Sequence, residues 1–79
     1  MSNADKLVQC FAEALGIDAG LVADTLSYDS IPQWDSVAHM ALVTELEAVF
    51  DVMLDTDEIL ALSSPVRARE ILAHHGVSF

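Results

Sequence analysis

The first apolar pattern of the chain lies between Asp5 and Leu15 and has the spacing of an amphipathic helix. Its apolar positions follow the i, i+3, i+4, i+7 rule and are Leu7, Val8, Cys10, Phe11, Ala14 and Leu15. Gly16 comes next, and glycine commonly ends a helix because it adopts a left-handed backbone without strain. The pattern therefore predicts a helix over residues 5–15.

A long connection is predicted between Gly16 and Trp34, where turn-forming residues interrupt any regular spacing. These residues are Gly20, Asp24, Ser27, Asp29, Ser30 and Pro32. Structureless loops of this length are uncommon in compact domains, so we expect the apolar residues of the connection to pin it to the core. They are Ile17, Leu21, Val22, Leu26, Tyr28 and Ile31. A short helical turn fits within the same segment.

A second helix is predicted from Asp35 or Ser36, either of which can cap it, to about Phe50. The residues expected on its core side are Leu42, Leu46, Val49 and Met53, flanked by His39, Val43 and Phe50. The outer side then carries Ser36, Val37, Met40, Ala41, Thr44, Glu47, Ala48 and Asp51. This outer face mixes apolar and acidic side chains.

Two further helices are predicted in the last third of the chain. Thr56 can cap a short one that ends near Leu62, and acids in its first turn favour the helix dipole. Ser64 and Pro65 form a clear start for the last one, which runs to about His74. Its apolar side holds Val66, Ala68, Ile71 and Leu72, and Gly76 ends it. Together these patterns predict an all-α fold in one domain, residues 1–79: a small four-helix bundle with three main helices, one short helix and a long loop after the first.

Composition and charge restrict the class of partner. A chain of 79 residues, 53% of them apolar, can build one modest core. Its formal net charge of -10 repels nucleic acids and anionic lipids but attracts basic protein surfaces. A lone Cys10 cannot form an intramolecular disulfide, and no apolar run reaches the roughly 18 residues of a membrane span. We therefore expect a cytoplasmic monomer with a basic protein partner, without nucleic acid binding or a membrane span.

Ser36 is the side chain whose position suggests chemistry. A helix N-terminus favours a bound phosphate oxygen, although the simplest interpretation of this serine is a helix cap. Catalysis by Ser36 itself is not expected, because His39 is the only nearby base and no G-x-S-x-G elbow is present.

The other candidate groups do not form a predicted site. His74 and His75 are adjacent and cannot both face one metal from a single helix. Cys10 lies on the apolar stripe of the first helix, where packing is the simpler explanation. The acids lack the D-x-D-x-D-G order of a calcium loop and are more simply a solvated face. We expect no metal site and no enzymatic activity of the chain's own.

Asp35-Ser36-Val37, taken with the helix pattern around it, resembles the acyl carrier protein family, whose usual triplet is Asp-Ser-Leu. The resemblance covers nearly the whole chain and includes Glu47-Ala48-Val49-Phe50, Asp57-Glu58-Ile59 and Ser64-Pro65. It implies an acyl-carrier-like bundle in which Ser36 bears a 4'-phosphopantetheine arm. A separate phosphopantetheinyl transferase takes that arm from coenzyme A and supplies the magnesium and the base. The arm's thiol would then carry acyl groups as thioesters.

The same resemblance implies that the outer face of the second helix docks partner enzymes, namely acyl-loading ligases or synthases with basic surfaces. Val37 and Met40 would make apolar contacts, and Glu47 and Asp51 would steer basic partners. The full predicted partner face is Asp35, Val37, Met40, Thr44, Glu47 and Asp51.

Two departures from the family pattern narrow the expected pathway. Carriers of fatty acid synthesis typically have acids in the two turns after the serine, whereas this chain has Ala38, His39 and Ala41. Trp34 before the triplet is similar to free-standing carriers of specialised lipid, polyketide or related pathways. Two alternatives remain open: an aminoacyl or peptidyl carrier of a nonribosomal peptide system, and an unmodified helical adaptor that binds a basic partner through the same face.

Overall fold

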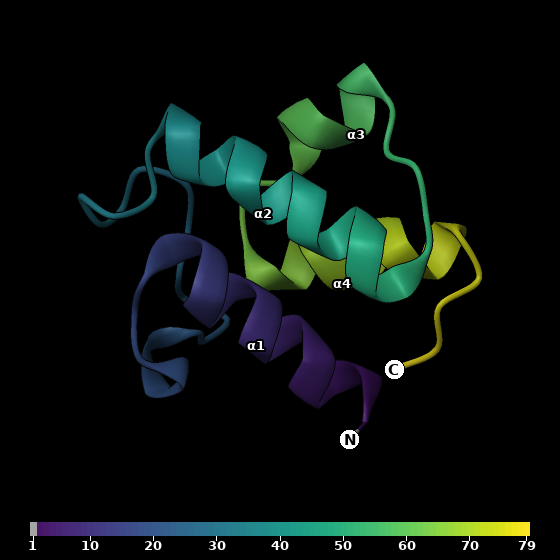
Figure 1. Ribbon diagram of the computed structural model, residues 1–79, viewed down its shortest axis with the longest axis horizontal. Coiled ribbons are helices and arrows are strands. Elements are labelled where there is room, and N and C mark those ends of the chain that lie inside the picture. The colour runs from purple at the N-terminus through teal and green to yellow at the C-terminus, as the bar shows by residue number, and fades with distance from the viewer. Residues whose placement is uncertain (1) are drawn as a thin grey trace.

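Four α-helices and one 3₁₀ turn make up the protein, in a computed structural model that describes residues 2–79 (Figure 1). The helices are α1 (Asn3–Leu15), α2 (Ser36–Phe50), α3 (Thr56–Ala61) and α4 (Pro65–His74), and the 3₁₀ turn η1 is Ala19–Leu21. No strand occurs within residues 2–79. The predicted all-α class, with three longer helices, a short one and a long loop after the first, is confirmed.

α1 and α2 lie against each other in opposite directions and form the main helix–helix contact (Figure 1). α1 begins where the Ser2 hydroxyl accepts a hydrogen bond from the Asp5 N–H at 3.1 Å. It ends at Gly16, whose φ of 66° is left-handed, as the sequence predicted. Leu7 and Phe11 of α1 are fully buried against Leu42 and Leu46 of α2 in one core. No helix among residues 2–79 is long and apolar enough to cross a membrane.

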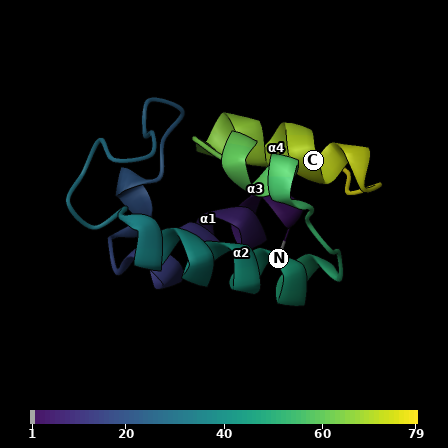
Figure 2. The ribbon, with the colours of Figure 1, turned by 90° about the horizontal axis from the view of Figure 1, so that it is seen from above.

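The long connection occupies one end of the bundle, where α1 ends and α2 begins (Figure 2). Leu26 and Trp34 anchor the connection in the core. Trp34 is 0% exposed, and its ring packs edge-on against that of Phe11, with 5.4 Å between the ring centroids. Ile17, Val22 and Ile31 are half-buried, so most of the expected anchoring is confirmed. Leu21 was wrongly expected to help, because it lies on the 3₁₀ turn and is 57% exposed.

The predicted core side of α2 is right at Leu42, Val43 and Leu46 and wrong at Val49 and Met53. α2 ends at Phe50, and Asp51 then takes a left-handed φ of 53°. The helical period therefore no longer applies at Met53, which is 82% exposed, while the chain turns and buries Leu54 instead. Val49 lies at the rim of the groove between α1 and α2 and is 42% exposed.

Side-chain caps set the starts of the last two helices. Asp55, rather than the predicted Thr56, caps α3. Its carboxylate accepts from the Glu58 N–H at 2.8 Å, and the Glu58 carboxylate accepts from the Asp55 N–H at 3.1 Å. This reciprocal capping box outcompetes a threonine cap one residue later. Ser64 caps α4 with Pro65 as its first residue, as predicted.

Candidate functional site

Ser36 is the first residue of α2, and its side chain is exposed. Asp35 is the cap: its carboxylate accepts a hydrogen bond from the Ala38 N–H at 2.9 Å. Of the two residues predicted to cap α2, the structure therefore selects Asp35. The Ser36 hydroxyl is left without a capping role and makes no hydrogen bond within residues 2–79.

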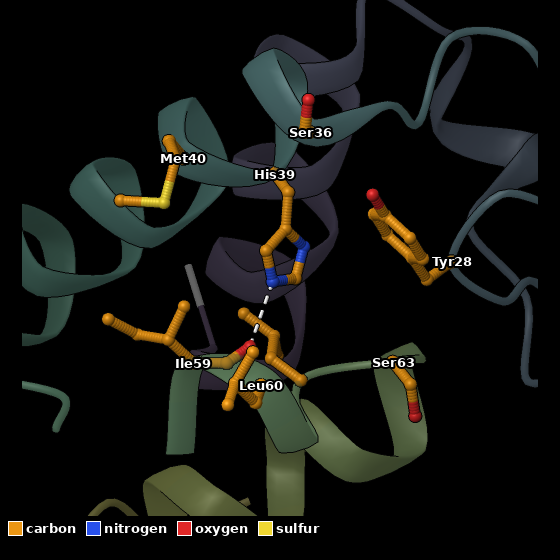
Figure 3. Close-up of a pocket in the computed structure, with 8 residues that line it drawn as sticks. Tyr28, Ser36, His39, Met40, Ile59, Leu60 and Ser63 are labelled. Atoms are coloured by element: carbon orange, nitrogen blue, oxygen red, sulfur yellow. Dashed lines mark hydrogen bonds between the residues drawn. The ribbon is translucent and has the colours of Figure 1, made fainter. Parts of the chain in front are cut away.

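A cavity of about 340 Å³ lies beside Ser36, between the first turns of α2, the α3 segment and the long connection (Figure 3). Most of its surface is apolar. The lining residues are Tyr28, Ser36, His39, Met40, Ile59, Leu60, Leu62 and Ser63. Segments far apart in the sequence thus meet next to one exposed hydroxyl.

His39 joins the walls of this cavity through both of its ring nitrogens. The indole N–H of Trp34 donates to His39 Nδ1 at 3.0 Å, and His39 Nε2 lies 2.9 Å from the carbonyl oxygen of Ile59 (Figure 3). An indole N–H can only donate and a carbonyl can only accept. The ring is therefore neutral, with its proton on Nε2. His39 links the buried end of the connection to α3.

His39 is not available as a base for Ser36. Both ring nitrogens are engaged, and Figure 3 shows the Ser36 hydroxyl directed away from the ring. His39 is half-buried, at the flank of the core side where the sequence analysis placed it. Neither ring nitrogen of His39 is therefore free to take the Ser36 proton.

Tyr28 closes the cavity on the side of the connection. Its backbone N–H donates to the Ser63 carbonyl at 2.8 Å, which joins the connection to the segment between α3 and α4. Its ring meets His39 and Trp34 edge-on, with centroid separations of 5.2 and 6.0 Å. The wall is therefore held by backbone and aromatic contacts together.

Of the predicted partner face, Val37, Met40 and Thr44 lie on the exposed side of α2, and Asp35 caps its start. Val37 and Met40 are 78% and 52% exposed, and Leu60 of α3 is 77% exposed next to the same cavity. The Thr44 hydroxyl donates to the Met40 carbonyl at 3.0 Å. This face therefore presents large apolar side chains to solvent beside Ser36.

Two acids of the same predicted face also shape the end of α2. The Glu47 carboxylate is half-buried and accepts from the Leu54 N–H at 2.9 Å, which holds the turn after the helix. Asp51 forms the left-handed end of α2. Both acids thus have structural roles that the sequence analysis did not anticipate.

The electrostatic field around Ser36 is negative. The sequence has no lysine or arginine between Lys6 and Arg67. Arg67 and Arg69 are paired with Glu70 and Asp24 at 3.1 and 2.9 Å. The surface formed by α2 and α3 therefore carries a net negative charge.

Glu58 and His75 connect α3 to the end of α4. The Glu58 carboxylate lies 2.7 Å from His75 Nε2. The pKa of Glu58 is lowered below its ordinary value of 4.5. The main cause is the hydrogen bond that its carboxylate accepts from the Asp55 N–H, and the hydrogen bond and charge of His75 add to it. His75 is thus an interhelical contact. Within residues 2–79, no three His, Cys, Asp or Glu side chains are placed to hold a metal ion.

The remaining candidate groups lie between α1 and α2, away from Ser36. Cys10 is 1% exposed, and burial together with the charges of Glu45 and Glu13 raises the pKa of its thiol to about 11. Its predicted core position is confirmed. Partial burial and the neighbouring Glu13 raise the pKa of Glu45. These two acids face each other across the helix pair.

Sequence reasoning identified Ser36, His39 and Met40 but missed the other cavity residues and the burial of Trp34. The missed lining residues are Tyr28, Ile59, Leu60, Leu62 and Ser63. A tryptophan needs a partner for its N–H when it is buried, and a histidine five residues later is one such partner. This pairing was the available signal.

Comparisons of the chain with protein-family models, with curated proteins and with solved structures find no match.

Proposed function

We propose that this protein is a carrier of the acyl carrier type, with a 4'-phosphopantetheine arm on Ser36 that shuttles thioester-bound acyl groups between partner enzymes. The observation that carries the proposal is the Ser36 hydroxyl itself. It is exposed, free of the capping role that Asp35 takes, and next to an apolar cavity. The proposal therefore rests on an exposed hydroxyl in the first turn of a 15-residue helix, beside an apolar cavity.

The residues around Ser36 fit a phosphodiester. The Ala38 N–H is taken by Asp35, but the N–H groups of Ser36 and Val37 belong to the first helical turn and have no partner within the helix. Such groups, together with the dipole of a 15-residue helix, favour a phosphate oxygen.

The proposed transfer needs a second enzyme. The Ser36 oxygen forms a bond to the phosphorus that carries the pantetheine group of coenzyme A, and the pyrophosphate bond breaks. Adenosine 3',5'-bisphosphate leaves, and a base on the phosphopantetheinyl transferase takes the serine proton. Because His39 cannot supply that base, the chain acts as the substrate of this reaction rather than its catalyst.

Partner recognition follows from the surface beside Ser36. The exposed Val37 and Met40 offer apolar contacts, and the acids of α2 and α3 attract enzymes with basic docking surfaces. We propose that these partners are the transferase and a dedicated acyl-loading ligase or synthase of a specialised pathway. Loading by an amino-acid-activating enzyme instead would point to a nonribosomal peptide system.

The test is intact-protein mass spectrometry after incubation with coenzyme A, magnesium and a broad-specificity phosphopantetheinyl transferase. We expect the wild type and Ser63→Ala, which removes another hydroxyl at the same cavity, to gain one phosphopantetheinyl group. Ser36→Ala should gain none while keeping the helical circular dichroism spectrum. A folded wild type that stays unmodified, also with a transferase from its own source organism, would contradict the proposal.

That negative outcome would favour the second candidate, an unmodified helical adaptor. The exposure of Val37, Met40 and Leu60 next to acids supports it, since such mixed surfaces suit a basic protein with apolar anchors. The two functions differ in whether they need the Ser36 hydroxyl oxygen. An adaptor keeps its partner affinity in Ser36→Ala, whereas a carrier loses its cargo.

A further inference from the structure

α3 is the least firmly packed helix of the bundle. None of its six residues is fully buried, and Leu60 is 77% exposed. A helix of this length has too few internal hydrogen bonds to be stable alone. The buried Leu54 and Leu62 anchor the chain on either side of it, at 6% and 1% exposure. The segment between these two leucines can therefore open locally while the core stays intact.

Two histidines hold this segment from outside. His39 of α2 bonds to the Ile59 carbonyl at 2.9 Å, and His75 at the end of α4 bonds to the Glu58 carboxylate at 2.7 Å. The Ile59 carbonyl belongs to the last turn of α3 and also accepts the Leu62 N–H, at 3.4 Å. The bond to His39 is the shorter of the two and ties this end of α3 to α2.

We propose that α3 is a lid over the cavity beside Ser36, and that the neutral form of His39 is the latch that keeps it closed. The lid regulates access to the site of the proposed function, and its importance for cargo rests on that function. Its mechanics depend only on the contacts of the unmodified chain.

Protonation of His39 releases the latch because of Trp34. His39 Nδ1 accepts a hydrogen bond from the indole N–H of Trp34, which is fully buried. A proton on Nδ1 would make both groups donors, so this hydrogen bond could no longer form. The ring must then leave Trp34, and its bond from Nε2 to Ile59 is lost with it. Acid therefore opens the lid, and neutral or basic solution closes it.

The other titratable groups around these contacts do not reverse that direction. Near His39 they are Tyr28, which meets the ring edge-on, and Asp35, whose carboxylate caps α2. On α3, the Glu58 carboxylate is bonded to His75 and the Asp55 N–H, with His74 nearby on α4. Protonation of His75 strengthens its bond to Glu58. The α4 contact therefore persists in mild acid while the His39 contact breaks.

The first experiment follows amide hydrogen exchange of the unmodified protein by NMR as the pH is lowered from about 8 to about 5. After correction for intrinsic rates, we expect exchange at Ile59 and Leu62 to rise on the order of tenfold in acid, as loss of about one net hydrogen bond implies. Exchange at Phe11 in α1 should not change. The Trp34 indole N–H signal should shift over the same pH range.

Two variants and the NMR signals of two methionine methyl groups serve as further readouts and controls for this test. His39→Phe keeps the ring but loses both bonds, so Ile59 and Leu62 should exchange fast at both pH values. His74→Gln, at an exposed histidine, should behave as the wild type. The Met40 methyl signal should shift as the cavity opens, and the Met53 methyl signal, already in solvent, should not.

Three results would overturn the lid. They are α3 exchange that is the same at both pH values, α3 exchange unaffected by His39→Phe, and equal acceleration of α1, α2 and α3, which would mean that His39 supports the whole fold. If His39→Phe does not fold, the wild-type titration decides alone. Because these measurements need neither coenzyme A nor Ser36 modification, they fail or succeed independently of the proposed function.

Discussion

The pair α1–α2 and the short helix α3 are held by different forces. The pair buries large apolar side chains, among them Phe11, Leu42 and Leu46, at 1% exposure or less. α3 buries no residue fully and depends on a capping box and on polar bonds from His39 and His75. Apolar burial changes little with pH, whereas each polar bond of α3 depends on a protonation state.

Because of this difference, the pH-dependent contacts of the molecule lie next to the candidate site. The cavity beside Ser36 has one wall on the rigid α2 and another on the loosely held α3. A stable scaffold can thus present a fixed serine while the opposite wall moves. The following substitutions test whether the two regions respond as differently as their contacts imply.

The largest effect is expected from Phe11→Ala. Phe11 is 0% exposed and packs on Trp34, so its truncation should cost about 3–5 kcal/mol of unfolding free energy. A domain of this size has a total of only about 4–12 kcal/mol. Urea denaturation should show the loss, while Met53→Ala, at an 82% exposed position, should change stability by less than about 0.5 kcal/mol. Equal losses in both variants would contradict the assigned core.

Asp55→Ala should have a smaller, local effect. It removes the cap of α3 at a cost of about 1 kcal/mol, which corresponds to about fivefold faster exchange of α3 amides. Asp57→Ala removes a charge from the same turn but no capping bond, so its cost should be about 0.3 kcal/mol. If amide exchange in α1 accelerates as much as in α3, the two regions do not open separately.

Glu45→Gln should stabilise the pair α1–α2 slightly at neutral pH. The pKa of Glu45 is raised, so the folded state favours the protonated carboxyl, and its contribution to stability is lost as pH rises above about 4.5. Glutamine imitates the protonated form. After solvent screening, the gain should be about 0.3 kcal/mol at pH 7 and should vanish in acid. Thermal melts across this range measure it, and a destabilised variant at pH 7 would contradict the sign.

Glu58→Gln should give the opposite pH dependence and the smallest change. The pKa of Glu58 is lowered, so its contribution is present above about 4.5 and is lost as pH falls through its folded value. The wild-type melting temperature should therefore approach that of the variant in acid and exceed it slightly near neutral pH. Glu70→Gln, at an exposed acid on α4, serves as the control. A variant that melts above the wild type near neutral pH would rule out a stabilising Glu58–His75 contact.

Much of the fold could be predicted because the deciding signals are local. Gly16 ends α1, and Ser64 with Pro65 starts α4, where they were expected. Such signals act within one helical turn and need no knowledge of the rest of the chain. The prediction was wrong at Thr56 because a competing cap, Asp55, had a reciprocal partner in Glu58.

Less of the candidate site could be predicted. Ser36 was identified from its position at a helix start, but its freedom from capping was not, since Asp35 offered the same chemistry one residue earlier. The burial pattern near the end of α2 also escaped prediction. Periodicity places Met53 on the core stripe only if the helix continues, and it stops at Phe50. Val49 is still helical, but it lies at the rim of the groove between α1 and α2 and is 42% exposed.

By itself, the sequence determined the helices, the end of α1, the start of α4, the acidic surface and a serine at the start of the second long helix, because propensity, capping and charge are local properties of the chain. Only the tertiary structure decided that Trp34 is buried, that His39 is neutral and tied to Ile59, and that a cavity lies beside Ser36. The physical reason is that these features need Tyr28, α2 and the segment 59–63 in contact. Their geometry therefore exists only once the chain has folded.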